Sequence, residues 1–177
     1  KAAEICGAKV YADSKELINA ENVDAVFIVS PGFAHVDSLL QAIEAGKRIF
    51  CEKPLCTTAE DCLKVVKAEE AAGKHLIQLG FMRRYDKGYQ QIKEALATGE
   101  YGEPLILHCT HRNPEVGTNY NTPMAVHDTA IHEIDVLHWL VDDEYESAQA
   151  VMPKVTKYSH SECQDPPLLF FFTKKSG

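Results

Sequence analysis

The sequence predicts an α/β fold in two parts: an incomplete parallel sheet of the doubly wound type, followed by an α+β domain with a largely antiparallel sheet. Short β-branched runs alternate with helical patterns as far as Gly80. Beyond Gly80 the apolar residues switch to a period of two, which is typical of a sheet open on one face. With 177 residues and 45% hydrophobic content, the chain can bury one good core or two small ones.

Three strands are expected in the first part, at residues 25–29, 48–51 and 75–79. The first is continuously apolar, which indicates a strand covered on both faces. A helix after it ends at Gly46, and a helix after the second strand begins at a capping box formed by Thr57 and Glu60 and ends at Gly73. Strand-helix repeats of this kind predict parallel pairing.

The second part is expected to hold a helix at residues 88–97, an alternating strand at 105–110, a polar loop at 113–122, an amphipathic helix at 128–140 and strands at 148–151 and 168–173. The polar loop is long enough to serve function. The sequence starts at the close of a helix and stops at residues 174–177 in a hairpin turn. We therefore expect a chain truncated at both ends.

Charge and composition exclude several classes of protein. The net charge is -8 and the lysines are interleaved with acids, which disfavours nucleic-acid binding. No apolar run approaches the roughly 20 residues that span a bilayer, and no signal-peptide pattern is present, so we expect a cytoplasmic protein without membrane contact. The six cysteines fall in apolar periodic segments without a Cys-x-x-Cys pair. They are interpreted as reduced core residues, and no metal site is expected.

The tripeptide Glu52-Lys53-Pro54 comes at the carboxyl end of the second expected strand. Ligands of open α/β sheets bind at that edge, so a lysine there would point into the binding crevice. A surface Lys-Pro turn is the alternative.

Asp128 and His132 lie four residues apart, so both would occupy one face of the expected helix. Oxidation of a secondary alcohol needs a base for the hydroxyl proton, a cation near the developing alkoxide and a hydride acceptor. His132, Lys53 and a nicotinamide would fill these roles. The alternative is a structural helix histidine with Asp128 as an N-cap.

Two polar clusters follow expected strands: residues 83–86, and His111-Arg112-Asn113. A polyol needs a matching set of fixed donors and acceptors, which such clusters supply. For Arg84 and Arg112, a solvated charge run or an interdomain salt bridge is an equal alternative. The remaining helix histidines, His127 and His138, are interpreted as structural.

Taken together, these motifs resemble the glucose–fructose oxidoreductase/inositol dehydrogenase/rhizopine catabolism family, and in particular its bacterial inositol 2-dehydrogenases. The matching segments are Ser30-Pro31 with His35, Glu52-Lys53-Pro54, residues 80–86, and Asp128 with residues 132–135. The resemblance runs the length of the chain. It implies that residues 1–81 are the C-terminal part of a Rossmann-type dinucleotide-binding domain and residues 82–177 the N-terminal part of a substrate-binding domain.

The resemblance also implies an activity and roles for individual residues. The expected reaction is oxidation of a secondary hydroxyl of a cyclic polyol, myo-inositol to 2-keto-inositol, with hydride transfer to NAD. Catalysis would rest on Lys53, Asp128 and His132. Arg83, His111 and Asn113 would bind the substrate, and the cofactor would contact Ser30, Pro31, His35, Glu52 and Lys53. A homotetramer is the expected assembly.

The sequence departs from the family in lacking the Gly-x-Gly-x-x-Gly turn and the acidic residue expected after the second strand. These elements hold the pyrophosphate and select between NAD and NADP, so that choice stays open. Two alternatives to inositol oxidation also stay open: a dehydrogenase for another inositol isomer or sugar, and a sugar-sensing relative without turnover.

Overall fold

The computed structural model describes residues 2–151 and 168–173. The chain divides into two compact units, Lys1–Gly80 and Phe81–Gly177, hereafter unit 1 and unit 2. Each unit is described by itself.

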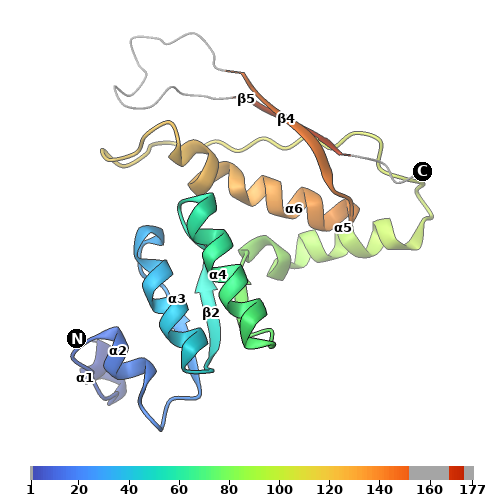
Figure 1. Ribbon diagram of the computed structural model, residues 1–177. Coiled ribbons are helices and arrows are strands. Elements are labelled where there is room, and N and C mark those ends of the chain that lie inside the picture. The colour runs from blue at the N-terminus through green and yellow to red at the C-terminus, as the bar shows by residue number, and fades with distance from the viewer. Residues whose placement is uncertain (1, 152–167, 174–177) are drawn as a thin grey trace. The chain divides into compact units, whose positions relative to one another are not determined.

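Unit 1 is a parallel three-stranded sheet in the order β1-β2-β3 with helices between the strands, and Figure 1 shows β2 of this sheet. Its elements are α1 (Ala2–Cys6), α2 (Ser14–Ile18), β1 (Ala25–Ile28), η1 (Gly32–Ala34), α3 (His35–Glu44), β2 (Arg48–Glu52), α4 (Ala59–Ala72) and β3 (Ile77–Gly80). Phe27 pairs with Phe50 and Glu52 with Gly80 in the sheet register. The three expected strands and their parallel pairing are confirmed, as is the helix at the start of the chain.

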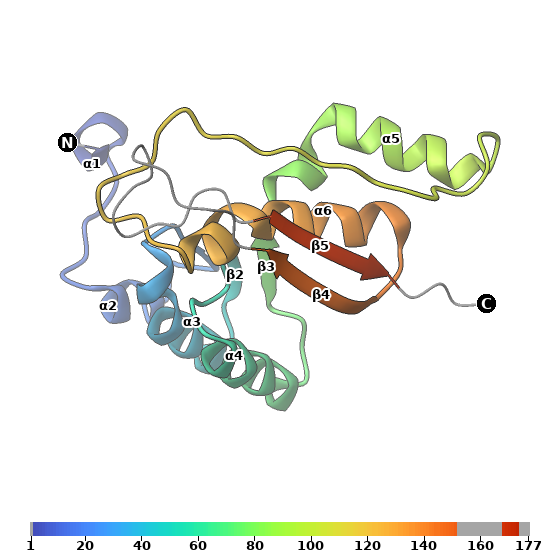
Figure 2. The same ribbon diagram turned by 90° about the horizontal axis from the view of Figure 1, so that it is seen from above.

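The core of unit 1 lies between one face of the sheet and the helices α3 and α4, which Figures 1 and 2 show on the same side. Val26 and Ile28 of β1 point into this core, whereas Phe27 between them is 70% exposed. The expectation that β1 is covered on both faces is therefore wrong for the described residues. Both helices follow their strands with the same hand, so they cover the same face.

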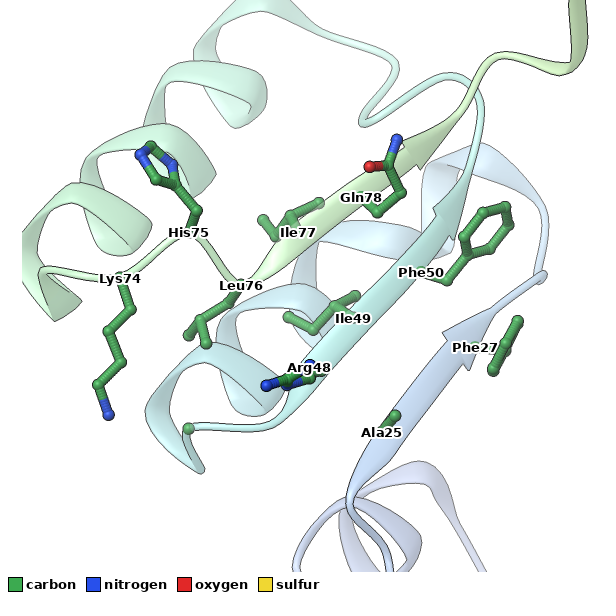
Figure 3. A pocket seen from close by; sticks show the side chains of 11 residues that line it. Ala25, Phe27, Arg48, Ile49, Phe50, Lys74, His75, Leu76, Ile77 and Gln78 are labelled. Atoms are coloured by element: carbon green, nitrogen blue, oxygen red, sulfur yellow. The ribbon is translucent and has the colours of Figure 1, made fainter. Parts of the chain in front are cut away.

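The opposite face of the sheet forms an open hollow, in which Phe27 and Phe50 lie on neighbouring strands with ring centroids 5.3 Å apart (Figure 3). Its other lining residues include Arg48, Lys74 and His75, which lie at or before the amino ends of β2 and β3. Ligands of parallel sheets bind at the carboxyl ends, so the hollow is not the candidate site.

The helices of unit 1 begin and end at local signals. Gly46 and Gly73 have positive φ, as expected for the residues that end α3 and α4. The capping box of α4 is shifted by one residue from the prediction: Thr58, not Thr57, is the N-cap, and its hydroxyl oxygen accepts from the Asp61 amide at 3.1 Å. Asp61 then takes the place expected for Glu60, and its carboxylate accepts from the Thr58 hydroxyl.

Unit 2 contains η2 (Met82–Tyr85), α5 (Lys87–Thr98), a π-helical segment η3 (Ala125–Ala130), α6 (Ile131–Val141) and an antiparallel pair, β4 (Tyr145–Val151) with β5 (Leu168–Thr173) (Figure 2). The expected helix near 88–97 and the last two expected strands are confirmed. The hairpin turn expected at 174–177 lies outside the described residues.

The strand expected at residues 105–110 is wrong: this stretch has no regular structure, and Leu105 and Ile106 are 84% and 89% exposed. A strand needs a neighbouring backbone to satisfy its amide and carbonyl groups. Among the described residues, β4 pairs with β5 and leaves this stretch without a ladder partner.

Five of the six cysteines lie among the described residues. Cys51 and Cys56 are buried in unit 1, as expected for core residues, and Cys62 is half-buried, whereas Cys6 and Cys109 are exposed, contrary to the prediction. Burial raises the pKa of the Cys51 thiol to about 12. Within residues 2–151 and 168–173, no group of three or more His, Cys, Asp or Glu side chains is placed to hold a metal ion. No helix in this described part is long and apolar enough to cross a membrane.

Candidate functional site

In unit 1, the predicted cofactor-binding residues gather where β1 and β2 end. Ser30 and Pro31 follow β1 and are exposed. Glu52 is the last residue of β2 and is also exposed, and Lys53, directly after it, is half-buried. The peptide bond between Lys53 and Pro54 is cis. These residues lie at the carboxyl edge of a parallel sheet, which is the edge that binds ligands in open α/β folds.

His35 differs from the other predicted cofactor residues because its side chain is fully buried, with 0% exposure. One ring nitrogen, Nδ1, lies 2.9 Å from the Pro54 carbonyl oxygen, and the other, Nε2, lies 2.6 Å from the Ser30 carbonyl oxygen. The assignment of His35 to the cofactor site stays a prediction, and the structure shows that its ring has no exposed surface. The ring joins the turn after β1 to the turn after β2.

In unit 2, the candidate catalytic pair lies where the π-helical segment passes into α6. Asp128 is half-buried inside η3, and His132 is 9% exposed in the first turn of α6. Asp128 is therefore not an N-cap, so the N-cap role considered for it is wrong. A π-helical turn contains one residue more than an α-helical turn and often occurs at functional sites. The four-residue spacing still keeps the two side chains on neighbouring parts of one helical surface.

The predicted substrate-binding residues of unit 2 come together around a carboxylate that the sequence analysis did not single out. Glu133 forms an ion pair with Arg83, and its two carboxylate oxygens each lie 3.2 Å from His111 Nδ1. His111 Nε2 lies 3.3 Å from the Asn113 side-chain oxygen. We call Arg83, His111, Asn113 and Glu133 the Glu133 cluster.

The Glu133 cluster is partly shielded from solvent and adjoins the candidate base. The side chains of Arg83, Glu133 and His111 are 16%, 13% and 26% exposed. The rings of His111 and His132 are 6.5 Å apart between centroids. His111 Nδ1 also lies 3.4 Å from Arg83 Nη2, so one ring nitrogen is near both members of the Arg83–Glu133 ion pair. The cluster therefore supplies donors and acceptors in fixed orientations next to His132.

Arg84 belongs to a structural ion pair rather than to the Glu133 cluster. Its Nε and Nη2 atoms donate to the two carboxylate oxygens of Asp135 at 2.9 and 2.6 Å. These hydrogen bonds raise the pKa of the Arg84 guanidinium. Both partners lie in unit 2, so the salt bridge expected for Arg84 exists but is not interdomain. It fastens η2, which carries Arg83, to α6, which carries His132 and Glu133.

His138 agrees with its structural interpretation. Its Nε2 lies 3.2 Å from a carboxylate oxygen of Glu144, and its ring centroid lies 6.1 Å from that of Tyr145. Tyr145 in turn donates its hydroxyl hydrogen to the Ile134 carbonyl at 2.7 Å. These contacts tie the end of α6 to the start of β4.

Glu133 and the burial of His35 were the features that sequence reasoning missed. Glu133 directly follows His132 in the sequence. A glutamate on an amphipathic helix is usually solvated, so this position does not indicate that Glu133 contacts Arg83 and His111. The contacts of His35 join residues 19 positions apart, which no local pattern encodes.

Comparison with known proteins gives matches over nearly the whole chain. Residues 1–81 match the model described as "Oxidoreductase family, NAD-binding Rossmann fold", and residues 89–169 match the GFO/IDH/MocA C-terminal domain. The chain is 57% identical to an inositol 2-dehydrogenase/D-chiro-inositol 3-dehydrogenase of Halalkalibacterium halodurans and 52% identical to an inositol 2-dehydrogenase of Pseudomonas syringae. These alignments cover 94% and 96% of the chain but 48% and 50% of the relatives.

A solved structure shares the fold closely. The myo-inositol dehydrogenase of Lactobacillus casei, in complex with NAD(H) and myo-inositol, has a TM-score of 0.91 and 45% identity, covering 98% of this chain and 52% of that one. The chain thus spans about half the length of the relatives it matches. Together, the two family models, the parallel sheet and these relatives show that the chain belongs to the GFO/IDH/MocA family of oxidoreductases.

Proposed function

We propose that a protein carrying this chain oxidises a secondary hydroxyl of a cyclic polyol, converting myo-inositol to 2-keto-inositol with NAD as hydride acceptor. The proposal assigns residues 1–81 to the cofactor domain and 82–177 to the substrate domain. Its main support is one conjunction: Lys53 lies at the carboxyl edge of the sheet, and the chain is more than half identical to a relative named for this activity. The assembly and location that go with the resemblance are a cytoplasmic homotetramer.

The proposed chemistry divides between the two units. His132 takes the proton of the reacting hydroxyl, because a histidine ring can act as a base near neutral pH. The Lys53 ammonium stabilises the alkoxide as its charge develops and contacts the nicotinamide ribose. Asp128 accepts a hydrogen bond from a neighbouring substrate hydroxyl. NAD, when bound, supplies the acceptor for the hydride that leaves the carbinol carbon.

Substrate recognition is assigned to Arg83, His111 and Asn113 of the Glu133 cluster. A polyol presents hydroxyls in fixed directions, and each one left unpaired in a closed pocket costs about 1–3 kcal/mol. The side chains of Arg83, His111 and Asn113 are already fixed by their contacts within the Glu133 cluster. This supports the assignment, because ordered side chains lose little further conformational freedom on binding.

A second inositol isomer is the alternative substrate with specific support. The relative from H. halodurans is named for both inositol 2-dehydrogenase and D-chiro-inositol 3-dehydrogenase activity. The Glu133 cluster would then bind either inositol isomer, provided that the isomer directs its reacting hydroxyl towards His132 and matching hydroxyls towards the cluster. Another sugar, or a sugar-sensing role without turnover, has no comparable support.

The direct test is steady-state reduction of NAD and of NADP by the full-length protein with myo-inositol, other inositol isomers and glucose. We expect NADH formation with myo-inositol. Lys53→Ala should lower turnover at least about a hundredfold, the scale for loss of one electrostatic stabiliser. Lys67→Ala, which removes an exposed lysine of α4 in the same unit, should leave turnover unchanged. A fall of less than about fivefold in folded Lys53→Ala protein would remove the catalytic role of Lys53.

His132 is tested separately through the pH profile of turnover. Turnover should rise with pH as the base loses its proton, and His132→Asn should abolish most activity with little effect on NAD binding. His127→Asn is the matched control, because His127 lies in the adjoining π-helical segment. A profile that stays unchanged in His132→Asn would assign proton removal to another group.

A further inference from the structure

The fully buried His35 ring bridges two turns at the carboxyl edge of the sheet in unit 1. The Ser30 carbonyl belongs to the turn after β1, and the Pro54 carbonyl belongs to the turn after β2. Both oxygens lie within hydrogen-bonding distance of ring nitrogens, at 2.6 and 2.9 Å. His35 is the first residue of α3, so a single side chain connects one helix with both turns.

The two contacts connect the ring with both turns. A backbone carbonyl oxygen only accepts hydrogen bonds, so the ring nitrogen is the donor in a bond to either turn.

The third polar atom near the ring is Cys51 Sγ, 3.4 Å from Nδ1. Its thiol donates to the Glu52 carbonyl at 3.2 Å, and burial raises its pKa to about 12, so it stays a neutral thiol at physiological pH. In the competing arrangement, Nδ1 accepts the Cys51 thiol hydrogen instead of donating to Pro54. The shorter contacts of Nδ1 with Pro54 and of Cys51 with Glu52 favour the link between Nδ1 and Pro54.

A second observation shows how closely the two turns approach. A Cβ atom added at Gly32, in the turn after β1, would lie 3.1 Å from both Cδ and Cγ of Pro54. This is tighter than ordinary van der Waals contact, so the absence of a side chain at residue 32 lets Pro54 pack against this turn. Polar and steric contacts thus both fix the position of Pro54, the residue bonded to Lys53.

We propose that His35 is a positioning residue that holds the Lys53–Pro54 turn against the Ser30–Pro31 turn and so fixes where the Lys53 ammonium lies. This role rests on the proposed catalytic function of Lys53. The ring is fully buried, and its two nitrogens lie within hydrogen-bonding distance of one backbone carbonyl oxygen in each turn. His35 acts on the reaction through Lys53 and does not itself touch the substrate.

The test compares two variants of the full-length protein that each keep one of the two links. The amide nitrogen of asparagine falls near the place of Nδ1, and that of glutamine near the place of Nε2. His35→Asn therefore retains the bond to Pro54, and His35→Gln retains the bond to Ser30. We expect His35→Gln to lower kcat at least about fivefold more than His35→Asn, with similar thermal stability and similar KM for NAD. Equal kcat in the two variants would overturn the positioning role.

Cys51→Ala separates the two possible partners of Nδ1. It should leave kcat unchanged, whereas a loss of activity equal to that of His35→Gln would show that Nδ1 is held by the thiol and would overturn the link to Pro54. A lower kcat in His35→Gln than in His35→Asn together with full activity of Lys53→Ala would instead refute the proposed function of Lys53 and leave the bridge between the turns intact.

Discussion

Replacing Arg84 with alanine should destabilise the protein through the carboxylate that it leaves behind. The Asp135 side chain is 8% exposed, and both of its oxygens accept hydrogen bonds from Arg84. Removing one partner of a fully buried pair costs about 3–5 kcal/mol. The Arg84 side chain is 39% exposed, so water can reach part of the site, and we expect about 1.5–3 kcal/mol.

The assay is urea unfolding of the full-length protein, comparing wild type, Arg84→Ala, Asp135→Asn and the double variant. The free energy of unfolding of the double variant should fall by less than the sum of the two single decreases, because the double variant has no unpaired charge. Arg84→Lys should fall between wild type and Arg84→Ala, since an ammonium cannot form the two-pronged contact. A loss below about 0.5 kcal/mol for Arg84→Ala, or strictly additive losses, would show that the pair does not fasten η2 to α6.

Three further predictions follow from the described contacts. Gly32→Ala should lower kcat by moving the Lys53–Pro54 turn, since the added Cβ would meet Pro54 ring atoms at 3.1 Å. Steady-state kinetics measure the change in kcat and a melting curve checks that the variant is folded; an unchanged kcat would contradict the prediction. Glu133→Gln should raise KM for myo-inositol about tenfold by freeing Arg83 and His111, with KM for NAD unchanged, and a uniform effect on both KM values would count against a role in substrate binding. Burial raises the pKa of the Cys51 thiol from 9.0 to about 12, so the unfolded chain loses this proton at a lower pH than the folded chain. The contribution of the buried thiol to the free energy of unfolding should therefore be complete below pH 9 and fall as the pH rises towards 12. Urea unfolding across that range measures this fall, which should be shallower in Cys51→Ala.

The parallel sheet of unit 1 could be predicted because its signals are local. The apolar runs, the glycines that end the helices and the strand-helix alternation each arise within a few residues of one another. The number of covered faces could not be predicted in this way. Phe27 contributes to an apolar run whether or not anything packs against it, and among the described residues it is exposed because α3 and α4 both pack on the other face of the sheet.

The incorrect strand at residues 105–110 has a similar cause. Alternation describes which side chains are apolar, but a strand also needs a partner backbone, and pairing is a long-range property. Leu105 and Ile106 carry the pattern and lie exposed in irregular structure.

The sequence was enough to predict which residues belong to the candidate site, but not which residues contact one another there. Lys53 was placed at the edge of a sheet from its position after a strand, and Asp128 and His132 from their helical spacing. Glu133 could not be identified, because its ion pair with Arg83 joins two separate elements of unit 2. His35 was assigned to the cofactor by resemblance, and its complete burial depends on two turns that meet only in the folded sheet.

A crystal structure of the full-length protein with NAD and myo-inositol bound would test the proposed dehydrogenase site without relying on mutagenesis. We expect one inositol hydroxyl within hydrogen-bonding distance of both Lys53 Nζ and a His132 ring nitrogen, with its carbon facing the nicotinamide. Arg83, His111 or Asn113 should contact the remaining hydroxyls. An inositol ring bound away from Lys53 and His132, or a nicotinamide bound away from the carboxyl ends of β1 and β2, would contradict the proposed dehydrogenase site.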